Sequence, residues 1–396
     1  MEFCELLRMG VQIQFAHRTF QWTNEAPGKA AVHCVIIGLG HENISPKTLW
    51  TYVNIKSVAT ALTAKNINPY LVDFDNVILT SKRSPICRVP EIREGSAAID
   101  NRHLIFDEAE KQELLRLYPS LAGFVRPFIW GDGFLNGHKK YCLWLVGCSP
   151  GDIAEMPGVL QKIDAVRRFR LSSGRAATVK LAAQPSLFGE IRQPTARYIF
   201  LPKTSSEQRS YLPIGFLHQD CIVNNTSLAI ENAQLFHFAI LCSHMHMAWM
   251  RYVCGRLKSD FRYSNTIVYN NYPWPSAVNS LPNKAVAQQI PAQAAIKTIA
   301  STKSDLASAK LIARIEAAAQ AVLDARAVHQ TAGASSTLAE LYDPSLMPAN
   351  LAKAHAALDQ AVDAAYQADG GVATYANDGE RVAFLFQRYA ALTSLL

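Results

Sequence analysis

The stretch TARYIFLPKTSSEQRSYLPIGF, residues 195–216, determines the character of the middle of the chain. Its two ends are rich in aromatic and β-branched residues, and the polar segment KTSSEQR between them is typical of a turn. This pattern predicts a β-hairpin. The stretch RPFIWGDGFLNGHKKYCLWLVG, residues 126–147, repeats the pattern with a glycine-rich loop. We therefore expect hairpins in the middle of the chain.

Helical patterns surround these hairpins. Residues 107–119, DEAEKQELLRLYP, have acidic residues in the first turn and a proline at the end, which is typical of a helix. Residues 231–258, ENAQLFHFAILCSHMHMAWMRYVCGRLK, predict one long helix that ends near Gly255, with Asn225, Thr226 or Ser227 as its cap.

The chain from about residue 277 differs in kind. Alanine makes up 32 of the last 116 residues, and segments 304–330, 348–368 and 379–396 have apolar residues at helical spacing. This composition predicts closely packed helices.

The first 56 residues predict a pair of strands. VQIQFAHRTFQW, residues 11–22, is followed by a turn at NEAPGK, residues 24–29, and by the apolar run AAVHCVIIGLG, residues 30–40. The second strand is expected to be buried on both faces. Because two strands cannot bury themselves, they must pack on a sheet outside this chain or on the domain that follows.

Together these patterns predict an α+β fold in three parts. Residues 1–56 form the strand pair, and residues 57–276 form a mixed domain with β-hairpins and a long helix. Residues 277–396 form an all-α helical domain.

Composition excludes several protein classes. Hydrophobic residues make up 49% of the 396 residues and charged residues 18%, so wholesale disorder is excluded. No run of 18 apolar residues predicts a membrane span, and the N-terminus lacks the pattern of a signal peptide. The eight cysteines stand singly with no CxxC, which favours reduced thiols in a cytoplasmic protein.

Positive charge is concentrated in one segment. Residues 161–210 carry ten basic and three acidic residues, an excess of +7 that equals the net charge of the whole chain. Serine, glycine and aromatic residues lie between the basic ones, which favours a nucleic-acid surface over a salt-bridged face. Solvated surface or structural ion pairs remain the alternative for each residue.

No complete catalytic motif is present. The sequence has no GxSxG, no GxxxxGK[ST] and no GxGxxG. His244 and His246 are two residues apart on a predicted helix and point in different directions, so a shared metal ion is not expected. Asp73 and Asp75 are expected on one face of a strand, which is compatible with a carboxylate pair but weak support for a metal site.

Several strings resemble one known family. QFAHRTFQWTNEAPGKAAVHCVIIGL (residues 14–39) resembles the last strands of the adenine-methyltransferase domain in MmeI-like type IIG restriction–modification enzymes. NPYLVDFDNVIL, the stretch RPFIWGDGFLNG, KTSSEQRSYLPIGF and FRYSNT with YPWP resemble that family's target recognition domain. LAELYDPSLMPANLAKAHAALDQAVDAAY resembles its helical C-terminal region. The resemblance covers nearly the whole chain.

The resemblance implies a DNA-recognition module that serves bacterial defence. The family's cofactor motif, its Asn-Pro-Pro-aromatic loop and its nuclease lie upstream of FAHRTF and are absent from this sequence. We therefore expect no cofactor in this chain and no unaided methylation, whereas the full-length enzyme uses S-adenosylmethionine. The expected partners are double-stranded DNA and the missing methyltransferase or nuclease portion. Whether the chain is a split gene or a truncated product stays open.

The candidate DNA-binding residues lie in three groups. The first tracks phosphates and reads bases; the second lies on the KTSSEQR turn and beside it; the third, weaker group lies on the glycine-rich loop. In that order they are Arg167, Arg168, Arg170, Arg175 and Lys180; Arg192, Arg197, Lys203, Ser205, Ser206, Glu207 and Arg209; and Asn136, His138, Lys139 and Lys140. Arginine on the turn could pair with guanine, and Glu207 could accept from cytosine.

Two other functions stay open from the sequence. The chain could be a specificity subunit that docks through its helices on a separate methyltransferase, or a folded but idle domain. The recognised base sequence cannot be derived, because loop geometry and DNA shape contribute to it.

Overall fold

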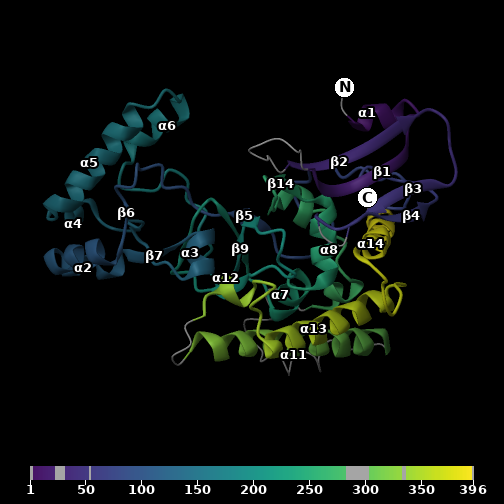
Figure 1. Ribbon diagram of the computed structural model, residues 1–396. Coiled ribbons are helices and arrows are strands. Elements are labelled where there is room, and N and C mark those ends of the chain that lie inside the picture. Colours follow the sequence, from purple (N-terminus) through teal and green to yellow (C-terminus); the bar gives the residue numbers. More distant parts are fainter. Residues whose placement is uncertain (1–2, 23–31, 53–54, 282–302, 332–335, 395–396) are drawn as a thin grey trace.

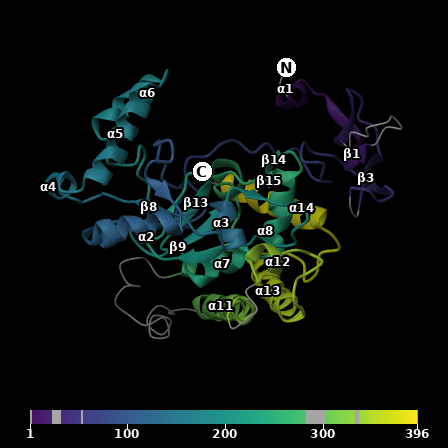
Figure 2. The same cartoon turned by 60° about the vertical axis from the view of Figure 1, so that its left-hand side comes forward.

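The computed structural model describes residues 3–22, 32–52, 55–281, 303–331 and 336–394. Figure 1 shows two parts that project from a central body: an N-terminal sheet on the right and the helices α5 and α6 on the left. The C-terminal helices α11 and α13 form the base. Figure 2 shows from another side that the two projecting parts lie at opposite ends of the molecule.

The N-terminal part is a four-stranded sheet. Helix α1 (Phe3–Arg8) precedes β1 (Gln12–Trp22), and β2 (Val32–Gly40), β3 (Lys47–Thr51) and β4 (Thr60–Ala64) follow. The strand order is β2-β1-β3-β4, with β1 antiparallel to β2 and parallel to β3. The predicted strand pair is confirmed, and its predicted turn at residues 24–29 lies outside the described residues.

The strand β2 differs from its prediction. The sequence predicted burial on both faces, yet no residue of β2 is fully buried. The physical reason is its position: β2 is the outermost strand of the described sheet, and of its side chains only Ile37 packs against the small cluster of this sheet.

A second sheet contains the hairpin predicted over residues 195–216. Its order is β11-β9-β13-β5, formed by β11 (Gly215–Leu217), β9 (Tyr198–Pro202), β13 (Ser227–Glu231) and β5 (Ile92–Glu94). The strands β9 and β11 pair antiparallel, as predicted. The KTSSEQR segment is more than a turn, because it contains β10 (Thr204–Ser205), which pairs with β15 (Asp260–Arg262). The strand β14 (Gly255–Leu257) completes this three-stranded sheet.

A third sheet packs against α5 on the left of Figure 1. Its order is β12-β7-β8-β6, from β12 (Ile222–Val223), β7 (Val125–Ile129), β8 (Tyr141–Leu143) and β6 (Ile105–Phe106). The glycine-rich loop between β7 and β8 contains α3 (Gly131–Asn136). The predicted helix at 107–119 is α2 (Glu108–Leu117), capped by Asp107 and Glu110. The helices α4 (Pro150–Ala154), α5 (Pro157–Leu171) and α6 (Ala176–Lys180) follow, with short 3₁₀ turns at Pro119–Gly123 and Leu181–Ala183.

The predicted long helix is two helices. These are α7 (Leu235–Leu241) and α8 (His244–Val253), separated at Cys242 and Ser243. The Ser243 hydroxyl accepts a hydrogen bond from the backbone N–H of His246 and so caps α8. A new helix therefore begins after Ser243. The cap of α7 is Gln234 rather than a residue at 225–227, because Ser227 already belongs to β13.

The C-terminal prediction is confirmed. The helices are α11 (Lys303–Gln330), α12 (Leu338–Leu341), α13 (Ala349–Ala368) and α14 (Asp378–Thr393), after a π-helical turn at Asn265–Tyr269 and a 3₁₀ turn at Ser276–Ser280. One hydrophobic core joins the sheet residue Leu201, Trp249 of α8 and Leu358 of α13. Of the helices in the described ranges, none has the length and apolar character that a membrane crossing needs.

Candidate nucleic-acid interface

The helices α5 and α6 carry exposed basic side chains, which we call the basic arm. Val159, Ile163 and Val166 of α5 pack on the third sheet, so the opposite side of the helix faces solvent. The arm's exposed bases are Arg167, Arg168, Arg175 and Lys180. None of them forms an ion pair with a residue that the structure describes. Their charge is therefore available to a polyanion.

Arg170 belongs to the same run of sequence but lies in the interior. It is 1% exposed, and its guanidinium donates to five backbone carbonyls at 2.7–3.0 Å, those of Ala98, Ile99, Leu181, Gln184 and Leu187. Burial lowers the pKa of this guanidinium. Arg170 has no N–H group to offer DNA, so we leave it out of the interface. Its spacing after Val159, Ile163 and Val166 is the sequence signal that places it on the buried face.

Two of the predicted bases are partly neutralised by a residue far away in sequence. The Lys203 ammonium donates to Glu94 Oε1 at 2.6 Å and to the carbonyl of Asn225 at 2.8 Å. Arg192 pairs with Glu190, lies 3.7 Å from Glu94 Oε2 and donates to the Gly95 carbonyl. No local pattern in the sequence reveals Glu94 as a partner of Lys203, because about a hundred residues separate the two.

Arg197 keeps its charge exposed in another way. Its guanidinium lies over the ring of Phe216, 4.1 Å from the centroid, and the residue remains exposed. A stacked guanidinium loses little of its capacity to donate hydrogen bonds at its edge.

The three-stranded sheet gathers the residues of the KTSSEQR turn. Ser205 is buried, the Ser206 hydroxyl accepts from the backbone of Gln208, and Glu207 lies 3.4 Å from a nitrogen of Arg256. Arg209 is half-buried, and burial lowers its pKa. Of this group, Ser205 therefore has the least access to a ligand.

The same sheet adds basic residues that the sequence analysis did not single out. Arg256 and Lys258 lie on the β14–β15 hairpin, and Arg262 pairs in register with Thr204. The signal was present in GRLKSDFR, where bases recur at every second or fourth position. The predicted helix over residues 231–258 includes GRLK, whereas these residues form β14 and the turn that follows it.

The glycine-rich loop holds its polar residues around one carboxylate. Asp132 accepts from the Asn136 side chain at 2.7 Å and pairs with His138 at 3.1 Å, which lowers the pKa of this carboxyl. The ammonium of Lys140 lies 4.9 Å from the ring centroid of Trp130, and Lys139 is exposed.

The aspartates and histidines considered above as metal ligands take part in contacts that hold the fold together. Asp73 and Asp75 do not lie on a strand, and Asp73 accepts from the backbone N–H groups of Lys65 and Asn66. His246 is buried against the Tyr263 hydroxyl at 3.0 Å, whereas His244 pairs with Asp378. Among the residues that the structure describes, no group of three His, Cys, Asp or Glu side chains could hold a metal ion.

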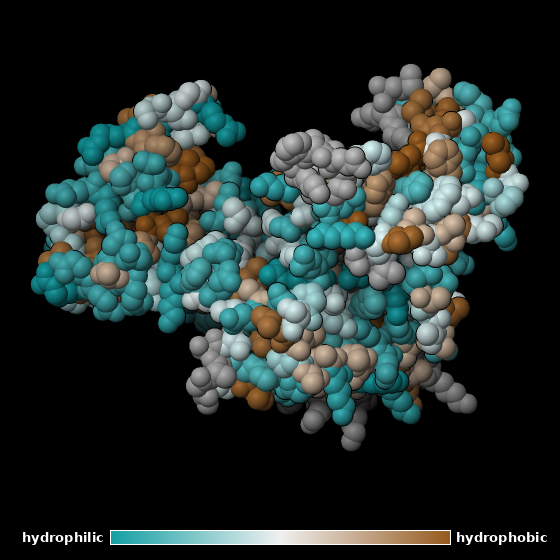
Figure 3. Space-filling view, viewed as in Figure 1, coloured by the Kyte–Doolittle hydropathy of each residue, from teal (hydrophilic) through white to brown (hydrophobic). Residues whose placement is uncertain are grey.

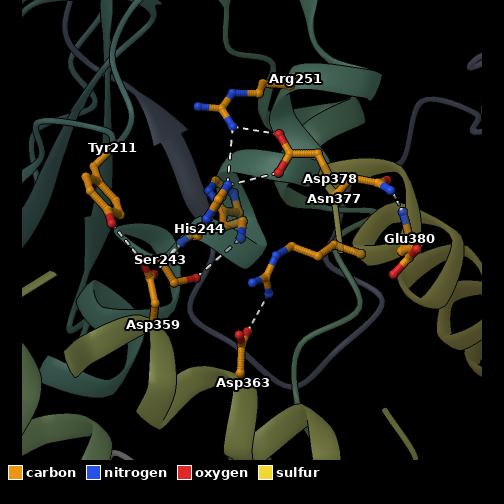
Figure 4. A network of polar contacts seen from close by, with 11 residues as sticks. Tyr211, Ser243, His244, Arg251, Asp359, Asp363, Asn377, Asp378 and Glu380 are labelled. Carbon is orange, nitrogen blue, oxygen red and sulfur yellow. Dashed lines mark hydrogen bonds and ion pairs between the residues drawn. The ribbon is translucent and has the colours of Figure 1, made fainter. Parts of the chain in front are cut away.

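A polar network joins α8 to the C-terminal helices, and we call it the joint (Figure 4). Asp378 at the start of α14 accepts from Arg251 at 2.6 Å and pairs with His244 at 2.9 Å. Asp359 of α13 accepts from the backbone N–H of His244 and from the Tyr211 hydroxyl, both at 2.7 Å. Burial raises the pKa of Asp378, but His244 and Arg251 outweigh it and hold that pKa at about 2.

A buried chain of hydrogen bonds extends the joint. Arg326 donates to the Tyr342 hydroxyl at 2.6 Å and to the Ile214 carbonyl, and Tyr342 is bonded to His355 at 2.8 Å. The Tyr366 hydroxyl donates to that of Tyr272. The strings LYDP, AH and YPWP contain Tyr342, His355 and Tyr272, so these strings form the packed joint rather than the basic surface.

Figure 3 shows a broad notch between the arm and the middle of the molecule. Figure 1 places α5 and α6 along one side of this notch and β14 on the other side. The notch is therefore bordered on one side by the unpaired bases of the arm and on the other by β14, whose Arg256 pairs with Glu207.

Comparisons with known proteins give one consistent result. Residues 2–51 match the family model of the MmeI DNA-methyltransferase domain, residues 73–276 that of the MmeI target recognition domain, and residues 307–396 that of the MmeI C-terminal domain. The chain is 33% identical to DNA methyltransferase A of Bacillus subtilis (strain 168) over 391 residues, which are 98% of this chain and 39% of that protein.

A solved structure agrees with these matches. It is described as the type IIL restriction–modification enzyme MmeI in complex with DNA, and it covers 99% of this chain at 40% identity with a TM-score of 0.81. This chain covers 47% of that one. The chain thus spans less than half the length of either relative.

Proposed function

Because the chain belongs to the MmeI family of restriction–modification DNA methyltransferases, we propose that it recognises double-stranded DNA in a sequence-specific way for an adenine N6-methyltransferase. In this proposal residues 1–56 are the end of the methyltransferase domain, residues 57–276 are the target recognition domain and residues 277–396 are the helical domain. The observation that carries the proposal is the unpaired charge of the basic arm beside the notch.

In this proposal the basic arm supplies the contacts to DNA that do not depend on the base sequence. Arg167 and Arg168 lie near the end of α5, Arg175 immediately precedes α6 and Lys180 ends it, so these bases can contact phosphates of one backbone. Phosphate contacts of this kind determine the register of the protein on the duplex. They also release counterions, which makes the affinity depend strongly on salt.

Base reading is assigned to the opposite side of the notch. The three-stranded sheet presents Glu207 with Arg256, together with Lys258, Arg262 and the half-buried Arg209. Arginine can donate to guanine and a carboxylate can accept from cytosine in the major groove. Two-stranded ribbons fit that groove, which suits the β14–β15 hairpin.

The chemistry belongs to another part of the enzyme. Adenine must leave the base stack for methylation of its N6, and a recognition domain holds the flanking duplex while this happens. The family is one of S-adenosylmethionine-dependent methyltransferases. We place the cofactor, the catalytic loop and any nuclease in the portion of the enzyme that this chain does not match.

A salt series tests the proposal. Fluorescence anisotropy with a duplex should give a steep fall in affinity as salt increases. The triple variant Arg167→Ala, Arg168→Ala, Arg175→Ala should flatten the slope of log affinity against log salt by about 2.7, or about 0.9 for each lost phosphate contact.

A matched control removes the same charge elsewhere. Lys310, Arg314 and Lys353 are exposed on α11 and α13, at the base of the molecule (Figure 1). Their replacement by alanine should leave the slope nearly unchanged. Equal losses in the two triple variants would show that net charge, rather than the arm, binds DNA.

A further inference from the structure

The segment that joins β10 to β11, residues 206–214, has a polar half and a buried half. The polar half contains Glu207 and Arg209, which are partly exposed. In the buried half Leu212 is 1% exposed and Ile214 is fully buried. Because one half directly follows the other, contacts that fix the buried half also determine where the polar half lies.

The polar half has little support from its own end of the segment. It follows β10, which consists of two residues, Thr204 and Ser205, that pair with β15. Within the polar half, the backbone N–H of Arg209 donates to the carbonyl of Ser206 at 3.3 Å, which is long for a hydrogen bond. The orientation of the polar half therefore depends mainly on the other end of the segment.

The C-terminal helices anchor that other end. Figure 4 shows the Tyr211 hydroxyl directed at Asp359 of α13, to which it donates at 2.7 Å. The Tyr211 ring stacks on His355 of the same helix, with ring centroids 3.9 Å apart and an angle of 16° between the planes. The Ile214 carbonyl accepts from Arg326 of α11 at 2.6 Å. All three partners lie more than a hundred positions further along the chain.

The Asp359 carboxylate has one oxygen for the segment and one for α8. Its Oδ2 accepts from Tyr211, and its Oδ1 accepts from the backbone N–H of His244 at 2.7 Å. Loss of the Tyr211 hydroxyl would therefore release the segment without detaching Asp359 from the start of α8. This separation makes the anchor accessible to mutation.

Charge from the helical domain also acts on Arg209. Burial lowers the pKa of its guanidinium, and the negative charges of Asp260 and Asp343 oppose that shift. Asp260 lies in β15, and Asp343 lies between α12 and α13. The helical domain thus holds the backbone beside Arg209 and attracts its side chain.

We propose that the C-terminal helical domain positions the base-reading segment, and that Tyr211, held by Asp359, is the positioning residue. The inference rests on the proposed function and adds a role for the helical domain in sequence specificity. Hydrogen bonds to base edges need side chains held within about 0.5 Å of the productive geometry. The anchor supplies this precision to Glu207 and Arg209, whereas the phosphate contacts of the basic arm do not depend on it.

The test separates specific from non-specific affinity. Selection from random duplexes with the full chain gives its preferred sequence, and anisotropy then gives Kd for that duplex and for a scrambled duplex of equal length. Tyr211→Phe removes the hydroxyl but keeps the ring on His355. It should weaken binding of the preferred duplex about tenfold, the scale of one misplaced base contact. The affinity for the scrambled duplex and the salt slope should stay unchanged.

The matched control is Tyr366→Phe. Tyr366 belongs to the same helix as Asp359, is fully buried, and donates from its hydroxyl to that of Tyr272 at 2.8 Å. The control should lower the free energy of unfolding but keep the ratio of the two Kd values. An equal loss of that ratio in both variants would overturn the proposal, because general loosening of the core would then be the cause.

A double-mutant cycle tests the route by which Tyr211 acts. The background Glu207→Ala, Arg209→Ala lacks the two side chains that the anchor is proposed to position. In this background Tyr211→Phe should change the ratio of Kd values by less than about twofold. A full loss there would overturn the proposal, since Tyr211 would then act on DNA independently of these side chains.

Hydrogen exchange distinguishes failure of this inference from failure of the proposed function. In the absence of DNA, Tyr211→Phe should speed exchange of the amides of residues 206–210 and leave those of α11 unchanged. Unchanged exchange in residues 206–210 overturns the positioning role even if the wild-type chain binds DNA. A wild-type chain that binds no duplex, or binds all duplexes alike, overturns the proposed function whatever the exchange shows.

Discussion

Arginine serves opposite purposes in the basic arm and in the joint. In the arm, Arg167 and Arg168 are exposed and have no ion-pair partner among the described residues. In the joint, Arg251 donates to Asp378 at 2.6 Å, and close by Arg381 of α14 donates to Asp363 of α13, also at 2.6 Å (Figure 4). The difference is whether the fold supplies an acceptor. A count of charges along the sequence cannot make this distinction, because acceptors such as Glu94 come from distant segments.

The residues that carry the family resemblance also differ from those proposed to bind DNA. Tyr342, His355 and Tyr272 lie in strings on which the family resemblance rests, and all three are buried in or near the joint. The residues proposed to bind DNA lie mostly outside those strings. The family resemblance therefore rests in part on residues that pack the interior, whereas the proposed DNA contacts are surface residues.

The largest expected effect is acid destabilisation of the joint and its surroundings. Burial lowers the pKa of His237 to about 4 and that of His246 to about 3, and it lowers the pKa of His355 well below its usual value. The unfolded chain binds these protons near pH 6.5, so stability is complete above that pH and falls as the pH drops. Between pH 7 and 5 we expect a loss of about 2 kcal/mol for each of His237 and His246.

Urea unfolding at the two pH values measures this loss. The variant His246→Gln should be less stable at pH 7 but should show a pH dependence smaller by about one proton. A free energy of unfolding that stays constant from pH 7 to 5 would contradict the buried, neutral state of these histidines.

The next effect contrasts two arginines of one helix. Arg170→Met leaves five backbone carbonyls without their donor, and we expect a loss of at least about 3 kcal/mol in the free energy of unfolding. Arg168→Met removes an exposed side chain and should change stability by less than about 0.5 kcal/mol. Similar values for the two variants in denaturant titrations would show that the arm does not depend on Arg170.

Local features of this fold could be predicted from the sequence. The capping box of α2, with Asp107 and Glu110, and the hairpin of β9 and β11 each depend on residues close together in the chain. The helices α11, α13 and α14 were recognisable because apolar spacing alone defines them.

Long-range features could not be predicted. The pairing of β10 with β15 and the ion pair of Lys203 with Glu94 join residues more than 50 positions apart. The break between α7 and α8 depends on Ser243, whose side chain could equally have faced outward on one continuous helix. Among the described residues β2 is the outermost strand of its sheet, and no local pattern can reveal which strands lie side by side.

A smaller effect concerns the carboxylate at the centre of the joint. Because Arg251 and His244 hold the pKa of Asp378 at about 2, below its value in an unfolded chain, this pair stabilises the protein above pH 4. The contribution, about 2 kcal/mol, is lost as the pH falls from about 4 to about 2. Asp378→Asn should remove that amount at pH 5 and less at pH 3, as measured by thermal or urea unfolding. A difference that does not shrink in acid would mean that the charge of Asp378 is not what stabilises the joint.

The smallest effect comes from removing the negative charge that partly neutralises Lys203, so that Lys203 loses its ion pair, like the bases of the arm. Glu94→Gln keeps an acceptor for Lys203 but removes the negative charge between Lys203 and Arg192. If Lys203 and Arg192 contact DNA, affinity should rise about fivefold at low salt, equivalent to about 1 kcal/mol, and the salt slope should steepen by about 1. Asp324→Asn, on α11, makes the same change in net charge and should have no effect. Weaker binding of Glu94→Gln would instead assign Glu94 to accepting a hydrogen bond from a base, because losing a repelling charge cannot reduce attraction to phosphate. Either shift would place Glu94 at the DNA, and no shift would limit the interface to the arm and the β14–β15 hairpin.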